Sequence, residues 1–134
     1  MSWWAAPDTL AEEVILIPEP ETVVLRYLDR MVAHDWAGTI ECLHPDVVRV
    51  GPFGDVYTPR GRYVDYLSAL LPTLVNYDLA IERTVAEQSV VLVQLSESME
   101  LDGSMDVTHE VLVFETDPAG LITRIDIFIQ RASS

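Results

Sequence analysis

Basic residues are scarce in this sequence: 8 Lys and Arg stand against 22 Asp and Glu, which gives a formal net charge of -14 at pH 7. A surface with this charge opposes attraction to phosphate backbones and to anionic lipid. We therefore expect neither nucleic acid nor a membrane surface as a partner. The acidity is interpreted mainly as a source of solubility, with recognition of a cationic ligand as the less favoured alternative.

Cysteine is scarce, and long apolar runs are missing. The single cysteine, Cys42, excludes an internal disulfide and a cysteine-rich metal site, and it is expected to fill the core. No apolar run approaches the roughly 20 residues that span a bilayer, and the N-terminus lacks the pattern of a signal peptide. These absences predict a soluble cytoplasmic protein.

Several motifs that mark common enzyme classes do not occur. The sequence contains no P-loop, no G-x-G-x-x-G and no G-x-S-x-G elbow, so nucleotide chemistry and the common serine hydrolase route have no support. The three histidines, His34, His44 and His109, lack metal-ligand spacing. We expect neither a metal nor a cofactor.

The 134 residues, 49% of them apolar, are enough for one domain with a sizeable core. Residues 1–20 form an N-terminal arm that ends in two prolines, and residues 21–134 form the domain. Trp3 and Trp4 in the arm are predicted to cover a hydrophobic edge or a dimer partner, with a lid over a pocket as the alternative.

The first half of the domain reads as helices with one short strand. Apolar residues recur at helical spacing from Glu21 to Val32, and Asp35 offers an N-cap for a second helix that carries Trp36, Ile40 and Leu43. The segment Val47–Val50 is typical of a strand. Gly61 and Arg62 then introduce a third helix that Pro72 ends.

The second half reads as four strands, over residues 78–87, 90–101, 104–115 and 121–131. Asp102-Gly103 is a strong hairpin signal, and a second turn spans residues 117–120. Short links between consecutive strands predict an antiparallel meander. The fold class is therefore α+β, with three helices packed on a curved antiparallel sheet around an apolar pocket.

A carboxylate interrupts the apolar face of the strand 90–101. Glu97 alternates in phase with Val93, Leu95 and Met99, so its side chain shares their face. Because burial disfavours the charge of a carboxylate, Glu97 is a candidate general acid or base. A structural role for Glu97, in an ion pair with Arg49 or Arg124, is an equally favoured interpretation.

Two further polar positions are candidates for the pocket. Glu110 and His109 lie on opposite faces of a strand that is largely apolar on both, and alternation alone does not decide which one lines the pocket. Tyr27 lies in the apolar stripe of the first helix, where core packing is favoured over hydrogen bonding into a pocket.

Residues 21–131 resemble the nuclear transport factor 2-like superfamily and its SnoaL-like group. The motifs that carry the resemblance, in order, are V-V-L-R-Y-L from Val23, H-D-W from His34, H-P-D-V-V from His44, G-P-F-G from Gly51, Gly61-Arg62, and G-L-I from Gly120. The resemblance implies a cone-shaped pocket between helices and a concave sheet. It also implies a homodimer joined through sheet faces.

The ketosteroid isomerase branch implies roles for individual residues. In that branch an Asp base moves a proton next to a carbonyl, while a tyrosine and a protonated carboxylic acid bind the oxyanion. Tyr27 matches the tyrosine and Glu110 the protonated acid, but Gly51 stands at the place of the base. Glu97 or Asp55 would then supply the base.

Two other branches offer partial matches. The limonene epoxide hydrolase branch implies an Asp-Arg-Asp arrangement. Glu97 falls near the position of one acid, and Arg49 lies at a pocket position. Ile127 stands at the position of the second acid, while Asp126 is one residue away and points outward. A SnoaL-type polyketide cyclase needs little beyond a shaped pocket and one acid or base.

We thus expect a cofactor-independent enzyme that performs isomerisation or cyclisation on a small apolar carbonyl or epoxide substrate. Glu97 is the expected base, and Tyr27 and Glu110 are the expected donors to negative charge. The expected substrate-binding residues are Arg49, Phe53, Thr108, Leu112 and Ile127. The alternative is a non-catalytic ligand-binding or dimeric interaction module, which a sealed cavity or a salt-bridged Glu110 would favour.

Overall fold

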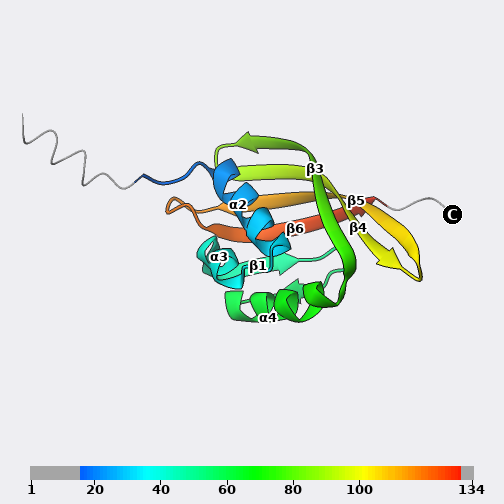
Figure 1. The fold of residues 1–134 in the computed structure, drawn as a ribbon. Coiled ribbons are helices and arrows are strands. Elements are labelled where there is room, and N and C mark those ends of the chain that lie inside the picture. The colour runs from blue at the N-terminus through cyan, green and yellow to red at the C-terminus, as the bar shows by residue number, and fades with distance from the viewer. Residues whose placement is uncertain (1–15, 131–134) are drawn as a thin grey trace, which may run out of the picture.

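The computed structural model describes residues 16–130, which form three α-helices, one 3₁₀ turn and a six-stranded sheet (Figure 1). The helices lie against one side of a curved, open sheet, as the sequence predicts. The predicted arm lies mostly outside the described residues, and so do the expectations for Trp3 and Trp4. None of the helices in the described part is long and apolar enough to cross a membrane.

Helix α2 (Pro20–Val32) follows the predicted periodicity. Pro20 occupies the first turn, where its missing N–H costs nothing. The helix packs on strands β3 and β4, and its apolar stripe is buried: Val23, Val24, Tyr27, Leu28 and Met31.

Helix α3 (Trp36–Glu41) is shorter than predicted. Asp35 caps it as expected, and its Oδ1 accepts a hydrogen bond from the Gly38 N–H at 2.9 Å. Leu43 was expected in this helix but instead begins strand β1 (Leu43–Val50). The predicted strand is therefore too short at its start. Pro45 is typical of a break between two elements, but here it lies inside β1, where the pairing register is irregular.

A two-residue strand, β2 (Val56–Tyr57), and helix α4 (Arg60–Leu70) follow. Pro72 ends the helix as predicted, in the 3₁₀ turn η2 (Leu71–Thr73). Helix α4 packs on β1 and β2, and buries Tyr63, Val64 and Leu67.

The four predicted strands of the second half are present. They are β3 (Val75–Glu87), β4 (Val90–Leu101), β5 (Ser104–Thr116) and β6 (Ile122–Gln130), and each pairs antiparallel with the next. Asp102 and Gly103 both have positive φ, as a type I′ hairpin requires. This hairpin projects beyond the body of the molecule (Figure 1).

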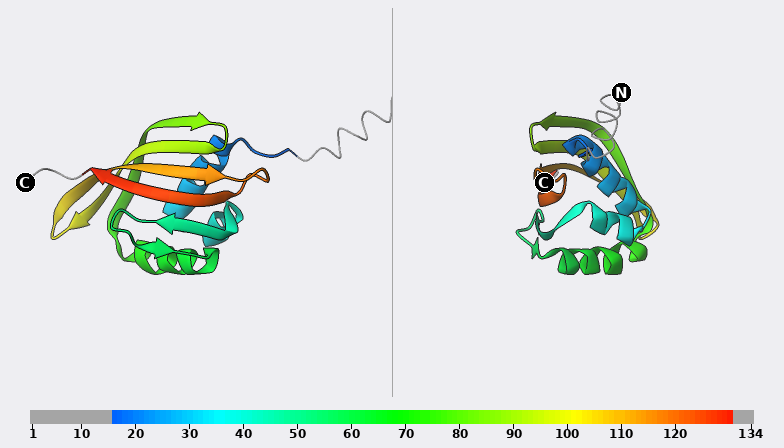
Figure 2. Two further views of the ribbon diagram at one scale, coloured as in Figure 1. Left: turned by 180° about the vertical axis from the view of Figure 1, so that it is seen from behind. Right: turned by 90° about the vertical axis from the view of Figure 1, so that its left-hand side faces the viewer.

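The sheet is mixed rather than wholly antiparallel. Its order is β2-β1-β6-β5-β4-β3, and β1 pairs parallel with β6. The prediction of a wholly antiparallel sheet was wrong at this strand pair. The parallel pairing joins β1 to a strand from which it is separated in the sequence by α4 and the meander. Figure 2 shows the result, a sheet that curves around α2 on one side only.

Candidate functional site

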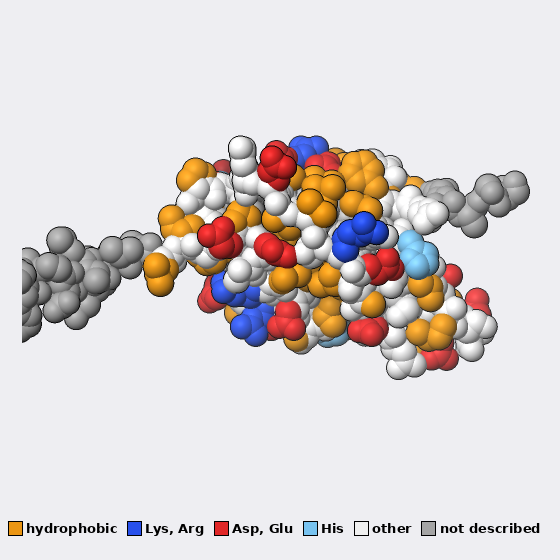
Figure 3. All heavy atoms as spheres, turned by 90° about the horizontal axis from the view of Figure 1, so that it is seen from above, with side chains coloured by type: hydrophobic (Ala, Val, Ile, Leu, Met, Phe, Trp, Pro, Cys, Tyr) orange, Lys and Arg blue, Asp and Glu red, His pale blue; other side chains and the backbone are white. Residues whose placement is uncertain are grey.

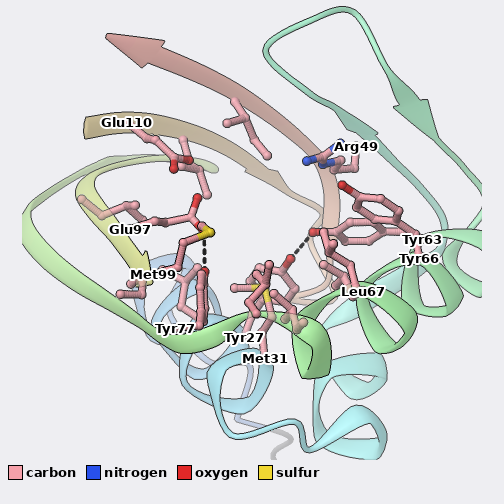
Figure 4. A pocket seen from close by; sticks show the side chains of 18 residues that line it. Tyr27, Met31, Arg49, Tyr63, Tyr66, Leu67, Tyr77, Glu97, Met99 and Glu110 are labelled. Atoms are coloured by element: carbon pink, nitrogen blue, oxygen red, sulfur yellow. Dashed lines mark hydrogen bonds between the residues drawn. The ribbon is translucent and has the colours of Figure 1, made fainter. Parts of the chain in front are cut away.

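A cavity of about 220 Å³ lies between the helices and the concave face of the sheet (Figure 4). Its wall is mostly apolar and contains seven polar side chains. The polar lining residues are Tyr27, Arg49, Tyr63, Tyr66, Tyr77, Glu97 and Glu110, and the apolar ones are Leu28, Met31, Leu67, Leu70, Leu71, Leu74, Leu79, Leu95, Met99, Leu112 and Ile127.

Two carboxyl side chains enter this cavity from adjacent strands. In the β4–β5 pairing Glu97 lies opposite Thr108, and Glu110 lies opposite Leu95. Glu97 and Glu110 are therefore diagonal neighbours on one face, within reach of each other's long side chains. Figure 4 shows both on the same side of the cavity.

Glu97 has a tyrosine as its partner rather than an arginine. The Tyr77 hydroxyl, from strand β3, donates a hydrogen bond of 2.5 Å to Glu97 Oε2. The expected alternative of an ion pair with Arg49 or Arg124 is wrong, because Arg49 pairs with Asp55 and Arg124 with Asp126.

Glu110 is held as a neutral acid at neutral pH. Its residue is 7% exposed, and it has no ion pair with any described residue. Burial raises the pKa of Glu110 to about 9, with a further contribution from the neighbouring Glu97 and an opposing one from Arg49. Glu110 can therefore act as a proton donor at neutral pH.

The neighbouring phenols also stay protonated. Burial, followed by the charge of Glu97, raises the pKa of Tyr77 well above its usual value. Burial likewise raises the pKa of Tyr27, and raises that of Tyr63 to about 12. These hydroxyls can act as hydrogen-bond donors over the whole physiological pH range.

Across the cavity, Tyr27 and Tyr63 share a hydrogen bond between their hydroxyls. Tyr27 comes from α2 and is 1% exposed, with its ring edge-on to Phe114 at 5.8 Å between centroids. Tyr63 comes from α4. The pair ties the two helices together at the cavity wall, and Figure 4 shows it well separated from the two glutamates.

Arg49 lies beside this tyrosine pair. Its Nη1 donates to Asp55 Oδ2 at 2.6 Å, and its guanidinium carbon lies 5.4–6.0 Å from the centres of three rings, those of Tyr57, Tyr63 and Tyr66. Burial lowers the pKa of Arg49, but nearby Tyr63 and Asp55 outweigh it and the net pKa is raised. The guanidinium is thus a permanent positive charge in an aromatic setting.

The structure brings together most of the residues that the sequence singled out. Six of them line the cavity: Tyr27, Arg49, Glu97, Glu110, Leu112 and Ile127. Phe53 does not line it and is 70% exposed in the turn after β1. Thr108 does not line it either, because it lies nearer the projecting hairpin than Glu110 does.

His109 points to the other face of β5. Its side chain is 59% exposed and lies 3.6 Å from Glu82. The structure thus resolves the alternative that alternation left open, and Glu110 is the residue that faces the cavity. Asp126 is also on the outer side, paired with Arg124, as expected for a residue one position from Ile127.

Three tyrosines in the wall were not predicted. Tyr63 and Tyr66 lie three residues apart on α4, and the spacing of Tyr63 with Leu67 is a helical signal that could have placed it on the buried face. Tyr77 precedes the predicted start of β3, so its alternation with Leu79 lies outside the predicted strand. Within residues 16–130, no group of three or more His, Cys, Asp or Glu could hold a metal ion.

Comparison with known proteins gives a family match and several similar folds. The SnoaL-like domain family matches residues 24–125. No curated protein matches the sequence.

Among solved structures, a protein from Shewanella denitrificans OS-217, described as a proposed SnoaL-like polyketide cyclase, has a TM-score of 0.76 at 14% identity, over 84% of this chain and 91% of that one. An epoxide hydrolase of M. tuberculosis, described as LEH-like, has a TM-score of 0.73 at 19% identity, over 83% and 82% of the two chains.

A third similar structure contains a small ligand. It is a Catenulispora acidiphila protein with a ketosteroid isomerase-like fold in complex with trimethylamine, with a TM-score of 0.70 at 13% identity, over 84% of this chain and 86% of that one. At these identities the likeness shows the fold alone.

Proposed function

Because this chain belongs to the SnoaL-like domain family, in a fold that includes isomerases, cyclases and epoxide hydrolases, we propose that it is a cofactor-independent acid/base enzyme. Its substrate would be a small, mostly apolar carbonyl compound, or an epoxide. The observation that carries this proposal is the pairing of Glu97 with the neutral Glu110 in the wall of an apolar cavity. Such a pair supplies a proton acceptor and a proton donor without further groups.

In the proposed reaction Glu97 removes a proton from the carbon next to a carbonyl. The C–H electron pair moves into the carbonyl group to give an enolate, and the proton passes to a Glu97 carboxylate oxygen. Tyr27 and Glu110 stabilise the delocalised negative charge from two sides by donating hydrogen bonds. Return of the proton to another carbon completes an isomerisation, while attack of the enolate carbon on a second carbonyl completes a cyclisation.

The mechanism places demands on Tyr77 and Arg49 as well. Tyr77 fixes the orientation of Glu97 through its 2.5 Å hydrogen bond to Oε2, and Oε1 would be the oxygen that takes up the proton. Arg49, which is paired with Asp55, adds N–H donors on the side of Tyr27 and Tyr63, and these favour negative charge on the substrate oxygen. For an epoxide, Glu97 would activate water and Glu110 would protonate the ring oxygen.

The test is proton exchange and turnover by NMR with β,γ-enones, polyketide-like carbonyls and epoxides. We expect Glu97→Gln to lower the rate at least about 100-fold, because it removes the base, and Glu110→Gln to lower it less, because an amide still donates a hydrogen bond. Glu115→Gln, at an exposed carboxyl of β5, is the matched control and should retain the wild-type rate. Equal rates in all folded variants would contradict the proposal.

The second candidate is a non-catalytic module that binds a small apolar molecule. It is supported by the hydrogen bonds that already engage two donors of the wall, from Tyr77 to Glu97 and between Tyr27 and Tyr63. Saturable binding of apolar ligands without exchange or turnover over the whole panel would favour this candidate.

We also propose a homodimer formed through the outer face of the sheet. Four apolar side chains on this face are exposed, and the pairing places Val85 beside Leu92 on neighbouring strands: Val85, Leu92, Val107 and Phe128. Exposed apolar side chains gathered on one face are typical of an interaction surface.

A further inference from the structure

We propose that Arg49 binds an acceptor oxygen of a neutral substrate, and that Asp55 makes this site reject carboxylates. The inference rests on the proposed function, because it names the class of molecule that would occupy the same cavity. It assigns the substrate its orientation: the oxygen lies at Arg49, on the side of Tyr27, and the reacting carbon lies toward Glu97.

The hydrogen bonding of Arg49 is incomplete. The residue is only 9% exposed, and a guanidinium carries five N–H donors. Among the described residues, the Asp55 carboxylate accepts a hydrogen bond from Nη1, and the Tyr66 hydroxyl is a second hydrogen-bond partner of the side chain. Its Nε is buried without a partner. This nitrogen is too deeply buried to reach a ligand, so the donors left for an acceptor from outside the chain are the remaining N–H groups on the two Nη atoms.

The free part of the guanidinium faces the cavity. Arg49 belongs to the cavity wall, and Figure 4 shows its nitrogen atoms directed toward the space between it and the glutamates. The rings of Tyr57, Tyr63 and Tyr66 surround the guanidinium. The face of an aromatic ring accepts a much weaker hydrogen bond than a carbonyl oxygen does. A substrate oxygen is the group that this geometry lacks.

Asp55 sets the charge of the substrate. It neutralises Arg49 through the 2.6 Å contact, so the site offers donors without a net positive charge. Asp55 does not line the cavity, but its charge lies so close to Arg49 that it would repel a carboxylate bound there, and the cavity holds a further carboxyl pair in Glu97 and Glu110. A ketone, ester or amide oxygen accepts the same hydrogen bonds without this repulsion.

Gly51 provides the space that Asp55 occupies. A Cβ added at position 51 would lie 2.3 Å from Asp55 Oδ1 and 2.5 Å from Oδ2, closer than real Cβ contacts allow. The carboxylate therefore takes the place where a side chain on residue 51 would begin. The absence of a side chain at Gly51 thus allows Asp55 to lie against Arg49.

The cavity volume limits the size of the molecule. About 220 Å³ lies below the roughly 300–1,000 Å³ of sites for drug-sized ligands. The substrate class is therefore a monocyclic or short-chain neutral carbonyl compound rather than one of steroid size.

Three probes of equal size test the proposal: acetophenone, α-methylstyrene, in which a CH₂ group replaces the oxygen, and benzoate. Binding to the full chain is measured by NMR titration or calorimetry. For the wild type we expect acetophenone to bind about tenfold more tightly than either of the others. In Arg49→Met the advantage of acetophenone over α-methylstyrene should disappear, while Arg124→Met, at an exposed arginine of β6, should retain it.

Asp55→Asn provides a test in the opposite direction. Removing this charge leaves Arg49 unneutralised, so the affinity for benzoate should rise about tenfold and exceed that for acetophenone. Since this is a gain of binding, a folding defect cannot produce it. Equal affinities for acetophenone and α-methylstyrene in the wild type, or no gain of benzoate binding in Asp55→Asn, would overturn the proposal.

The binding results are independent of those for the reaction. If Glu97 performs no chemistry, deuterium exchange at the acetophenone methyl group is absent but the three affinities still follow the expected order. If Arg49 does not bind the oxygen, the affinities lose that order even when Glu97-dependent exchange occurs with other carbonyl compounds.

Discussion

At the residue scale, the neutral state of Glu110 links the cavity to the stability of the whole fold. Its pKa is about 9 in the folded chain against an ordinary value of 4.5, so between these pH values the folded state holds a proton that the unfolded state has released. Stability should therefore fall as pH rises through this window, by up to about 1.4 kcal/mol per pH unit, and level off above the folded pKa.

Glu110→Gln removes this titration. We expect its free energy of unfolding, measured with urea at a series of pH values, to vary less across the window than that of the wild type. The variant should be the more stable of the two at the alkaline end. Glu115→Gln, at an exposed position, is the control and should follow the wild-type curve; a Glu110→Gln curve parallel to it would refute the assigned protonation state.

Gly51 gives a second prediction at this scale. Gly51→Ala should displace the Asp55 carboxylate, because the added Cβ would overlap it, and so break the contact with Arg49. A cost of about 1–3 kcal/mol is expected from the buried charge that loses its partner. The free energy of unfolding from urea titration measures it.

Gly61→Ala is the matched control for this substitution. Nothing lies within 4 Å of a Cβ added there, and Gly61 is inside α4. Alanine should stabilise the helix by about 0.5–1 kcal/mol relative to glycine. If Gly51→Ala is as well tolerated as Gly61→Ala, Asp55 does not occupy the position that we assign to it.

The sequence was informative about single residues where strand alternation applied. It placed Glu97 on the inner face, and the structure adds that Glu110 joins it there. It could not reveal the hydrogen bond of Tyr77 to Glu97 or the contact of Asp55 with Arg49, because both depend on how neighbouring backbones are placed in space. A one-dimensional pattern gives the face of a residue but not its partner.

At the element scale, local signals predicted the structure well and long-range pairing did not. Helix α2 and the hairpin at Asp102 follow from apolar spacing and turn chemistry, which act within a few residues. The parallel contact of β1 with β6 joins segments about 75 residues apart in the sequence. Nothing in either segment specifies its neighbour, so only the folded sheet shows it.

The cap of α3 allows a prediction for this scale. Asp35→Ala removes the acceptor for the Gly38 N–H and should cost about 0.5–2 kcal/mol of stability. Asp35→Asn keeps the acceptor and removes only the charge, so most of the stability should remain. Thermal and urea unfolding would measure both; equal losses in the two variants would assign the effect to the 3.8 Å ion pair with Arg30 instead.

At the scale of the whole molecule, the two faces of the sheet have different surroundings. The concave face, with α2 and α4 across it, encloses the cavity (Figure 2). Acidic side chains are spread among apolar ones over the surface seen in Figure 3, in keeping with a net charge of -14. A charged surface of this kind favours solubility, so an exposed apolar region on it needs a separate explanation.

The outer face of the sheet supplies that region and the last prediction. Phe128 is 59% exposed and lies opposite Val111 in the β5–β6 pairing. If two copies associate through this face, Phe128→Asp places a charge against apolar surface and should weaken the dimer at least tenfold. Phe53→Asp, at a position that is 70% exposed in the turn after β1, is the control and should leave the dimer intact. Light scattering over a concentration series measures both, and a wild type that remains monomeric throughout would contradict the dimer and leave the apolar face to another partner.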